Sequence, residues 1–190
     1  MIKTFIRFLA WLEERLLPLE LSLARFHLPQ PIEKPTVSSV SALLLQEMSY
    51  DCEAEMRKAK SMLSCLNTEQ KQFFDEIMSN LSSEKGGLFC VDAPGGTGKT
   101  YLLNCILSAV RSDSHIAIAT ALSAVASKLL AGGTTLHSRL KVPIQVRKDS
   151  VCSFTNAVAK LMTKAKLLII DEVSMGHRHC YEALDRYICI

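Results

Sequence analysis

The sequence predicts an α/β fold in which helices cover both faces of a parallel sheet. Three short apolar runs have the character of strands buried on both faces, namely GLFCV at 87–91, IAIA at 116–119 and LLII at 167–170. Longer segments with apolar residues at helical spacing separate these runs. Because strand and helix alternate, we expect the strands to be parallel and the helices to pack on the sheet.

The residues ahead of this alternation are expected to form a helical segment and a linker. Residues 2–16 carry apolar side chains at helical spacing, which favours a packing helix, with a membrane-surface helix as the alternative. LPQPIEKPTVSS at 28–39 holds three of the six prolines and is typical of a linker. A helical stretch of mixed charge follows at about 40–64. We therefore assign residues 1–63 to the N-terminal segment and residues 64–190 to the α/β domain.

The domain begins with LNTEQKQFFDEIMSNL at 66–81, which predicts a helix with one apolar face. Asn67 fits the N-cap of this helix and Gln70 its third position, so the two side chains would form a capping box. A functional alternative is that the Gln70 amide, which both donates and accepts, reads the edge of adenine. The two roles are compatible. After the second strand, ALSAVASKLLAG at 121–132 predicts a helix closed by Gly132.

The stretch DAPGGTGKT at 92–100 lies between a predicted strand and a predicted helix, and it matches the pattern G-x-x-x-x-G-K-[ST] except that Ala93 replaces the first glycine. Backbone amides in such a loop wrap a phosphate, assisted by the positive end of the following helix. Lys99 would reach the β- and γ-phosphates, and the Thr100 hydroxyl would hold Mg²⁺. The predicted nucleotide-binding residues of the loop are Gly95, Gly96, Thr97, Gly98, Lys99 and Thr100.

A second motif, Asp171-Glu172, follows the buried run LLII. Carboxylates at the C-terminal ends of parallel strands lie where such sheets bind ligands. Asp171 would hold Mg²⁺, directly or through water, and Glu172 would orient or deprotonate the attacking water. Together the two motifs predict binding and hydrolysis of a nucleoside triphosphate, with Lys99 and Glu172 as catalytic residues and Mg²⁺ as cofactor.

Positive charge is concentrated in one segment, although the net charge is only +3. Residues 125–170 carry eight Lys or Arg and one acid, which indicates either a solvated basic face or a surface that contacts DNA phosphates without sequence preference. The seven cysteines include no C-x-x-C pair and several fall inside apolar runs, so we expect buried free thiols in a reducing compartment. No apolar run is long enough for a membrane span, and we expect no membrane partner and a monomer.

The ordered motifs resemble those of the Pif-one helicases, which are superfamily-one, ATP-dependent, 5′-to-3′ DNA helicases. The resemblance covers about residues 22–190 and is carried by LNTEQKQFFDEI, APGGTGKT, ATALSAVASKLLAGGTTLHSRLKVPI and LLIIDEVSM. Two further stretches, LARFHLPQP and KTYLLNCIL, are most similar to the Helitron branch, which transposons encode. The sequence departs from the usual family residues at Ala124, Ser127 and Lys128.

This resemblance implies a RecA-like ATPase lobe that is incomplete, with Gln70 reading adenine, ATP as substrate and single-stranded DNA as partner. It implies that the DNA-facing residues are Thr120, Thr135, His137 and Ser138. It also implies a nuclear protein acting in DNA repair, recombination and telomere maintenance. Two alternatives remain open at this point. One is a P-loop ATPase of AAA type, and the other is a truncated chain that binds ATP without unwinding DNA, because the family's second lobe is expected beyond Glu172.

Overall fold

The computed structural model describes residues 23–26, 28–29, 39–152 and 154–188, and the chain divides into two compact units, Met1–Ala42 and Leu43–Ile190. In the first unit the 3₁₀ helix η2 spans Leu23–Phe26, and the Leu28 amide donates to the Leu23 carbonyl over 3.1 Å. The helix predicted at 2–16 and most of the predicted linker lie outside the described residues. All that follows concerns the second unit.

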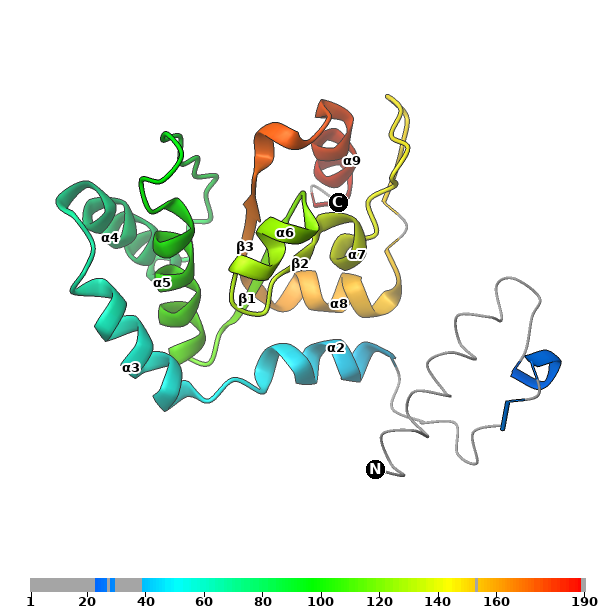
Figure 1. The fold of residues 1–190 in the computed structure, drawn as a ribbon, viewed down its shortest axis with the longest axis horizontal. Helices are drawn as coiled ribbons and strands as arrows, with labels where there is room; N and C mark the ends of the chain where they lie inside the picture. Colours follow the sequence, from blue (N-terminus) through cyan, green and yellow to red (C-terminus); the bar gives the residue numbers. More distant parts are fainter. Residues whose placement is uncertain (1–22, 27, 30–38, 153, 189–190) are drawn as a thin grey trace. The chain divides into compact units, whose positions relative to one another are not determined.

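The described sheet has three parallel strands in the order β2-β1-β3 (Figure 1). The central strand β1 spans Ile116–Ala121 and is buried along its whole length. It pairs with β3, Ala165–Asp171, on one side and with the two-residue strand β2, Thr134–Thr135, on the other. The α/β architecture with a parallel sheet is therefore confirmed, and so are the strands predicted at 116–119 and 167–170.

The strand predicted at 87–91 is wrong for this structure. Residues 85–94 form neither helix nor strand, and the side chain of Leu88 is 99% exposed. Gly86 enters the segment with a φ of 65°. An apolar run becomes a strand only where a neighbouring strand pairs with its backbone, and among the described residues β3 pairs with β1 alone. The third strand is instead β2, which is too short and too polar for an apolar pattern to reveal.

Helices α3 (Cys52–Leu63), α4 (Thr68–Ser82) and α5 (Lys99–Ser112) cover one face of the sheet (Figure 1). Their apolar side chains form one core cluster with alternate residues of the strands, including Phe74, Ile77, Leu102, Ile106, Val110, Ala117, Ala119 and Ile169. The capping box of α4 is confirmed, because the Asn67 side chain accepts from the Gln70 amide and the Gln70 side chain accepts from the Asn67 amide.

The opposite face is covered by α7 (Leu136–Leu140), α8 (Asn156–Lys164) and α9 (Arg178–Ile188). Leu168 and Ile170 of β3 pack into this second cluster, whereas the alternate residues Leu167 and Ile169 belong to the first. Side chains of successive strand residues point to opposite faces. Both faces are thus apolar, as a continuous run such as LLII predicts.

The remaining helices are shorter than predicted or interrupted. The helix expected over 121–132 is α6, which spans only Ala124–Leu129 after its N-cap Ser123, and Gly132 lies in the following turn with a φ of 68°. The stretch expected at about 40–64 consists of α2 (Ser39–Met48) and α3, because Asp51 caps a new helix. The 3₁₀ helix η3 spans Val173–Met175.

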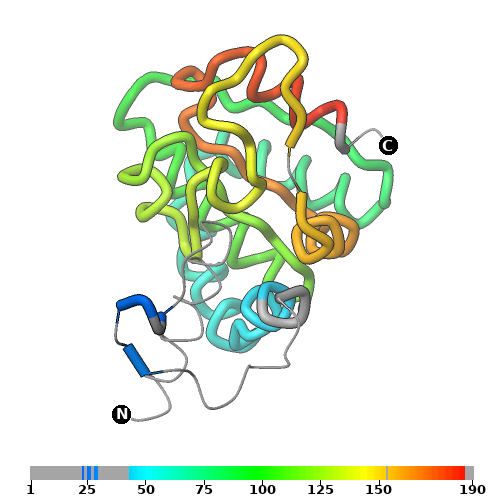
Figure 2. The backbone as a smooth tube through the Cα atoms, turned by 90° about the vertical axis from the view of Figure 1, so that its right-hand side faces the viewer, coloured from blue at the N-terminus to red at the C-terminus, as the bar shows by residue number. Residues whose placement is uncertain are grey.

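The compact unit begins at Leu43, ahead of the predicted boundary at residue 64. Ala59 of α3 is buried in the first core cluster beside α5, and Leu44 of α2 packs against the cluster of Ile116, Ile118 and Leu161. From Leu43 onward, α2 runs beside α8 in both Figures 1 and 2. The α/β domain therefore includes α3 and part of α2, which the predicted alternation of strands and helices did not indicate.

Within the described residues the cysteines are free thiols, as expected, but only half of them are buried: Cys105, Cys152 and Cys180 are, whereas Cys65 and Cys90 are exposed and Cys52 is half-buried. Burial raises the pKa of the Cys105 and Cys152 thiols. Among the helices of the described ranges, none combines the length and the apolar character that crossing a bilayer requires.

Candidate nucleotide site and DNA-facing pocket

The glycine loop makes its turn at residues 95–98, immediately before α5. Gly96 and Gly98 have φ angles of 78° and 86°, a left-handed conformation that residues with a Cβ rarely adopt. A Cβ at Gly98 would also lie 2.9 Å from Nε2 of Gln70. The first amides of a helix have no acceptor within the helix and carry the positive end of its dipole. The loop therefore presents donors and positive potential to an anion.

Lys99 lies within the curl of this loop. Its Nζ donates to the carbonyl oxygens of Ala93, over 2.5 Å, and Pro94, over 2.9 Å. The Thr97 hydroxyl also donates to the Pro94 carbonyl, over 2.8 Å. The ammonium group is thus held at the loop by neutral carbonyls. A phosphate oxygen is a stronger acceptor for an ammonium group than a carbonyl is, so the arrangement is suited to an exchange of these acceptors for a phosphate.

The loop and the acidic motif meet at Thr100. Oγ1 of Thr100 lies 3.5 Å from Oδ2 of Asp171, which is 71 residues later in the chain. Oδ1 of Asp171 accepts from the Glu172 amide over 2.9 Å. A hydroxyl and a carboxylate side by side offer the hard oxygen ligands that Mg²⁺ prefers. The residues present therefore fit the predicted metal site. The fold brings the two motifs together although they are far apart in the sequence.

Glu172 has an unusual backbone. Its φ and ψ are 57° and 40°, in the left-handed region, although it is not a glycine. Its side chain is exposed, and its carbonyl accepts from the amide of Met175, the last residue of η3. Strained residues of this kind are concentrated at functional sites. The strain is consistent with the catalytic role predicted for Glu172.

Gln70 joins α4 to the glycine loop. Its Oε1 accepts from the Asn67 amide over 3.0 Å, and its Nε2 donates to the Thr97 carbonyl over 3.0 Å. Both halves of the amide are thus engaged by the protein. Reading adenine would require these bonds to be exchanged, and that role stays a prediction.

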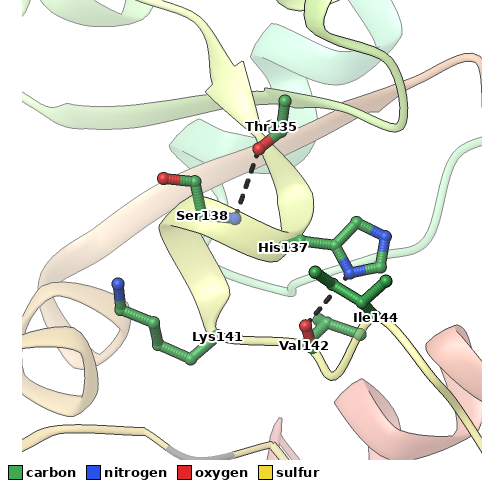
Figure 3. Close-up of a pocket in the computed structure, with 6 residues that line it drawn as sticks. All are labelled: Thr135, His137, Ser138, Lys141, Val142 and Ile144. Carbon is green, nitrogen blue, oxygen red and sulfur yellow. Dashed lines mark hydrogen bonds between the residues drawn. The ribbon is translucent and has the colours of Figure 1, made fainter. Parts of the chain in front are cut away.

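Three of the four predicted DNA-facing residues meet in one pocket of about 450 Å³ (Figure 3). Thr135 caps α7 by accepting from the Ser138 amide over 3.3 Å. Nδ1 of His137 lies 3.0 Å from the Val142 carbonyl, so the histidine ring is fixed in the pocket wall. The pocket is lined by Thr135, His137, Ser138, Lys141, Val142 and Ile144. Sequence reasoning missed Val142 and Ile144, whose apolar character carried no signal of a pocket.

One predicted DNA contact is corrected by the structure, and one residue of the basic segment is buried. Thr120 is fully buried and its hydroxyl donates to the Ile169 carbonyl over 2.7 Å, so it does not face a ligand. It lies within the central strand, where side chains on either face are covered by helices. Arg139 is one of the eight basic residues of segment 125–170, but it is buried and its Nε donates to the Thr134 hydroxyl. Lys141, Arg147 and Lys148 remain exposed beyond α7.

The two sites lie at one edge of the sheet. Ala121 at the end of β1 is paired with Asp171 of β3 on one side and with Thr135 of β2 on the other. Adjacent strands are about 4.8 Å apart, so the backbones at Asp171 and Thr135 are separated by about 10 Å. The predicted metal ligand and the wall of the pocket are therefore two strand spacings apart.

Comparison with known proteins agrees with this geometry. Residues 65–189 match the family of PIF1-like helicases, which covers more than half of the chain. The chain belongs to the PIF1-like helicase family. Its family match includes Gln70, the glycine loop, the pocket helix α7 and the Asp171-Glu172 pair. The Helitron branch stays a prediction.

Individual relatives are helicases of much greater length. The ATP-dependent DNA helicase PIF4 of Trypanosoma brucei brucei is 29% identical over 126 residues, which are 63% of this chain and 14% of that protein. The ATP-dependent DNA helicase dda of Enterobacteria phage T4 is 30% identical over 125 residues, 63% of this chain and 28% of that protein. The Candida albicans PIF1 helicase is 26% identical over 159 residues, 82% of this chain and 17% of that protein. This PIF1-like chain thus spans less than a third of these relatives.

Proposed function

We propose that this chain carries the nucleotide-binding part of an ATP-dependent DNA helicase that moves 5′-to-3′ along single-stranded DNA. The observation that best supports the proposal is the approach of the Thr100 hydroxyl to the Asp171 carboxylate, at 3.5 Å, beside a glycine loop with left-handed Gly96 and Gly98. Such an arrangement has a clear use in phosphoryl transfer and no evident structural need.

In this proposal each residue of the site has one task. The loop amides and Lys99 bind the phosphates of ATP, and Lys99 exchanges the carbonyls of Ala93 and Pro94 for phosphate oxygens. Thr100 and Asp171 hold Mg²⁺, which neutralises charge on the β- and γ-phosphates when bound. Glu172 orients the attacking water and accepts its proton. The sum of these tasks is hydrolysis of ATP.

Single-stranded DNA is proposed to contact the pocket formed by Thr135, His137 and Ser138, with Lys141 nearby. Hydroxyls, an imidazole and a lysine bind phosphate oxygens and carry little sequence information, so binding is nonspecific and weakened by salt. Ala121 pairs with both Thr135 and Asp171, so a shift of the backbone at Asp171 during ATP hydrolysis can reach the DNA pocket through one intervening strand. Work of this kind in the nucleus, in DNA repair, recombination or telomere maintenance, is part of the proposal.

Nucleotide binding tests the central claim. We expect Lys99→Ala to weaken binding of a fluorescent ATP analogue with Mg²⁺ by about tenfold or more, because a charge-assisted contact to phosphate is lost. The matched control is Lys58→Ala, which removes an exposed lysine on α3. Equal affinity of the Lys99 variant, the control and the unmutated chain would refute the proposed site.

A further inference from the structure

A cluster of three charged side chains is buried beneath the DNA-facing pocket. Glu47 of α2 lies between Arg139 of α7 and Arg111 of α5, at 2.9 Å and 3.9 Å respectively. All three side chains are at most 4% exposed. Burial raises the pKa of the Glu47 carboxyl, and the two arginines oppose that rise. Charged groups are rarely buried unless they are paired, so the position of each of the three constrains the others.

Arg139 connects this cluster to the pocket. Its Nε donates to the Thr134 hydroxyl on β2 over 3.2 Å, while its terminal nitrogen reaches Glu47. The residues immediately before it on α7, His137 and Ser138, line the pocket, whereas Arg139 is buried. One side of this five-residue helix is therefore offered to a ligand and the other is fixed by Glu47.

Arg111 fixes the turn that leads to the pocket. Its guanidinium donates to the carbonyls of Ala131, over 2.8 Å, and Ala117, over 3.0 Å, and lies 4.0 Å from the centre of the Tyr50 ring. The turn passes close to that ring at Gly132, where a Cβ would lie 2.0 Å from the Tyr50 hydroxyl. Arg111 of α5 thus holds the turn that leads to β2 and α7, and Tyr50, from the segment between α2 and α3, packs against both Arg111 and the turn.

The buried cluster is not the arrangement that would contribute most to the stability of the fold. It buries two positive charges and one negative charge, and Oε2 of Glu47 and Nε of Arg111 have no hydrogen-bond partner within the described residues. Apolar side chains of similar volume often stabilise a core as well as a buried ion pair does. A buried polar group with defined partners instead favours one arrangement of the elements that carry them.

We propose that Glu47 is a positioning residue for DNA binding: through Arg139 and Arg111 it fixes α7 and the turn at residues 131–133, so that His137 and Ser138 face single-stranded DNA. The inference rests on the proposed function for its DNA readout. It adds to the family match, which begins at residue 65 and does not include Glu47. The helix α2 is then part of the DNA-binding apparatus although it touches no DNA.

The test uses the 190-residue chain with two variants and a matched control. Arg139→Lys keeps the buried charge but cannot contact Glu47 and Thr134 together, because lysine lacks the guanidinium fork. Glu47→Gln removes the charge at nearly constant shape. Glu84→Gln makes the same change at a surface ion pair with Lys166, where the glutamate side chain is 76% exposed. For each we measure affinity for a fluorescent oligothymidylate and for a fluorescent ATP analogue, thermal unfolding, and the ¹⁵N shifts of the His137 ring.

We expect Arg139→Lys and Glu47→Gln to weaken oligothymidylate binding by about three- to tenfold, to shift the His137 ring signals, and to leave affinity for the ATP analogue unchanged. The control should match the unmutated chain throughout. Unchanged His137 signals and DNA affinity in a folded Arg139→Lys chain would overturn the proposal, as would an equal loss of nucleotide affinity in both variants. If the unmutated chain binds no oligothymidylate, the DNA-binding function fails, and the His137 signals alone then decide whether Glu47 positions α7.

Discussion

At the scale of single residues, the site depends on backbone conformations as much as on side chains. Gly96 and Gly98 provide left-handed turns that let Lys99 lie inside the loop, and Glu172 adopts the same region without being a glycine. The glycines were evident from the sequence, because their spacing before Lys99 and Thr100 has one familiar use. The strain at Glu172 was not, because nothing in a carboxylate's neighbours along the chain reveals its φ.

Gly132 permits a test of the packing beneath the pocket. We expect Gly132→Ala to lower the free energy of unfolding by about 1–3 kcal/mol more than Gly86→Ala does. Both glycines have left-handed φ angles, 68° and 65°, so the conformational cost is shared. Only at Gly132 would the new methyl group meet the Tyr50 hydroxyl, whereas the space at Gly86 is open. Chemical denaturation of the two variants gives the comparison, and equal losses of stability would show that the Tyr50 contact does not constrain the turn.

At the scale of elements, strands of aliphatic residues and helices with an apolar face were predictable. A strand that depends on pairing with a distant segment of the chain was not. IAIA and LLII became β1 and β3, and LNTEQKQFFDEIMSNL became α4 with its capping box. GLFCV has the same composition as a buried strand but finds no partner, and the two threonines of β2 are a strand only because β1 lies beside them. Long-range pairing is not encoded in the local periodicity of a segment.

The site shows the same division. The meeting of the loop with Asp171, and of Thr135, His137 and Ser138 in one pocket, agrees with what their compact motifs predict, while the roles of these residues stay predictions. Thr120 was assigned to the DNA side by its position in a motif, but its hydroxyl is used inside the sheet. Glu47 carried no signal at all, since its partners Arg111 and Arg139 are more than sixty residues away in sequence.

The irregular segment ahead of the loop should be cut by a protease before the helix α3 is. We expect limited trypsin digestion to cleave after Lys85 before it cleaves after Lys58, since residues 85–94 have no regular structure while Lys58 lies within α3. Both lysines are exposed, so access alone does not separate them. Mass spectrometry of the early fragments identifies the first site, and prior cleavage at Lys58 would contradict the order of stability inferred from the fold.

At the scale of the whole molecule, one sheet with two apolar faces supports two candidate ligand regions at the same edge. The glycine loop leads directly into α5, which lies with α3 and α4 on one face of the sheet, while α7, α8 and α9 lie on the other, with the pocket at α7. Helicase motion generally comes from lobes that close over the nucleotide and move against each other.

We therefore expect the 190-residue chain, tested by itself, to bind the ATP analogue weakly and to separate no duplex. It spans 14 to 28% of the length of the PIF4 and dda helicases that it resembles. The measurement is release of a labelled strand from a duplex with a 5′ single-stranded tail, in the presence of Mg²⁺ and ATP, with intact dda as the positive control. Release of the labelled strand that depends on ATP would show that a single lobe suffices.

The pairing of Ala121 with both Asp171 and Thr135 has one more consequence. The interval between the two ligand regions is set by hydrogen-bonded peptide groups and not by the side chains they carry. Mutation can therefore exchange nearly every residue of the three strands for another of similar size and leave that interval the same. Proteins that share this fold would therefore keep the same distance between the nucleotide site and the proposed DNA-binding pocket while their sequences diverge.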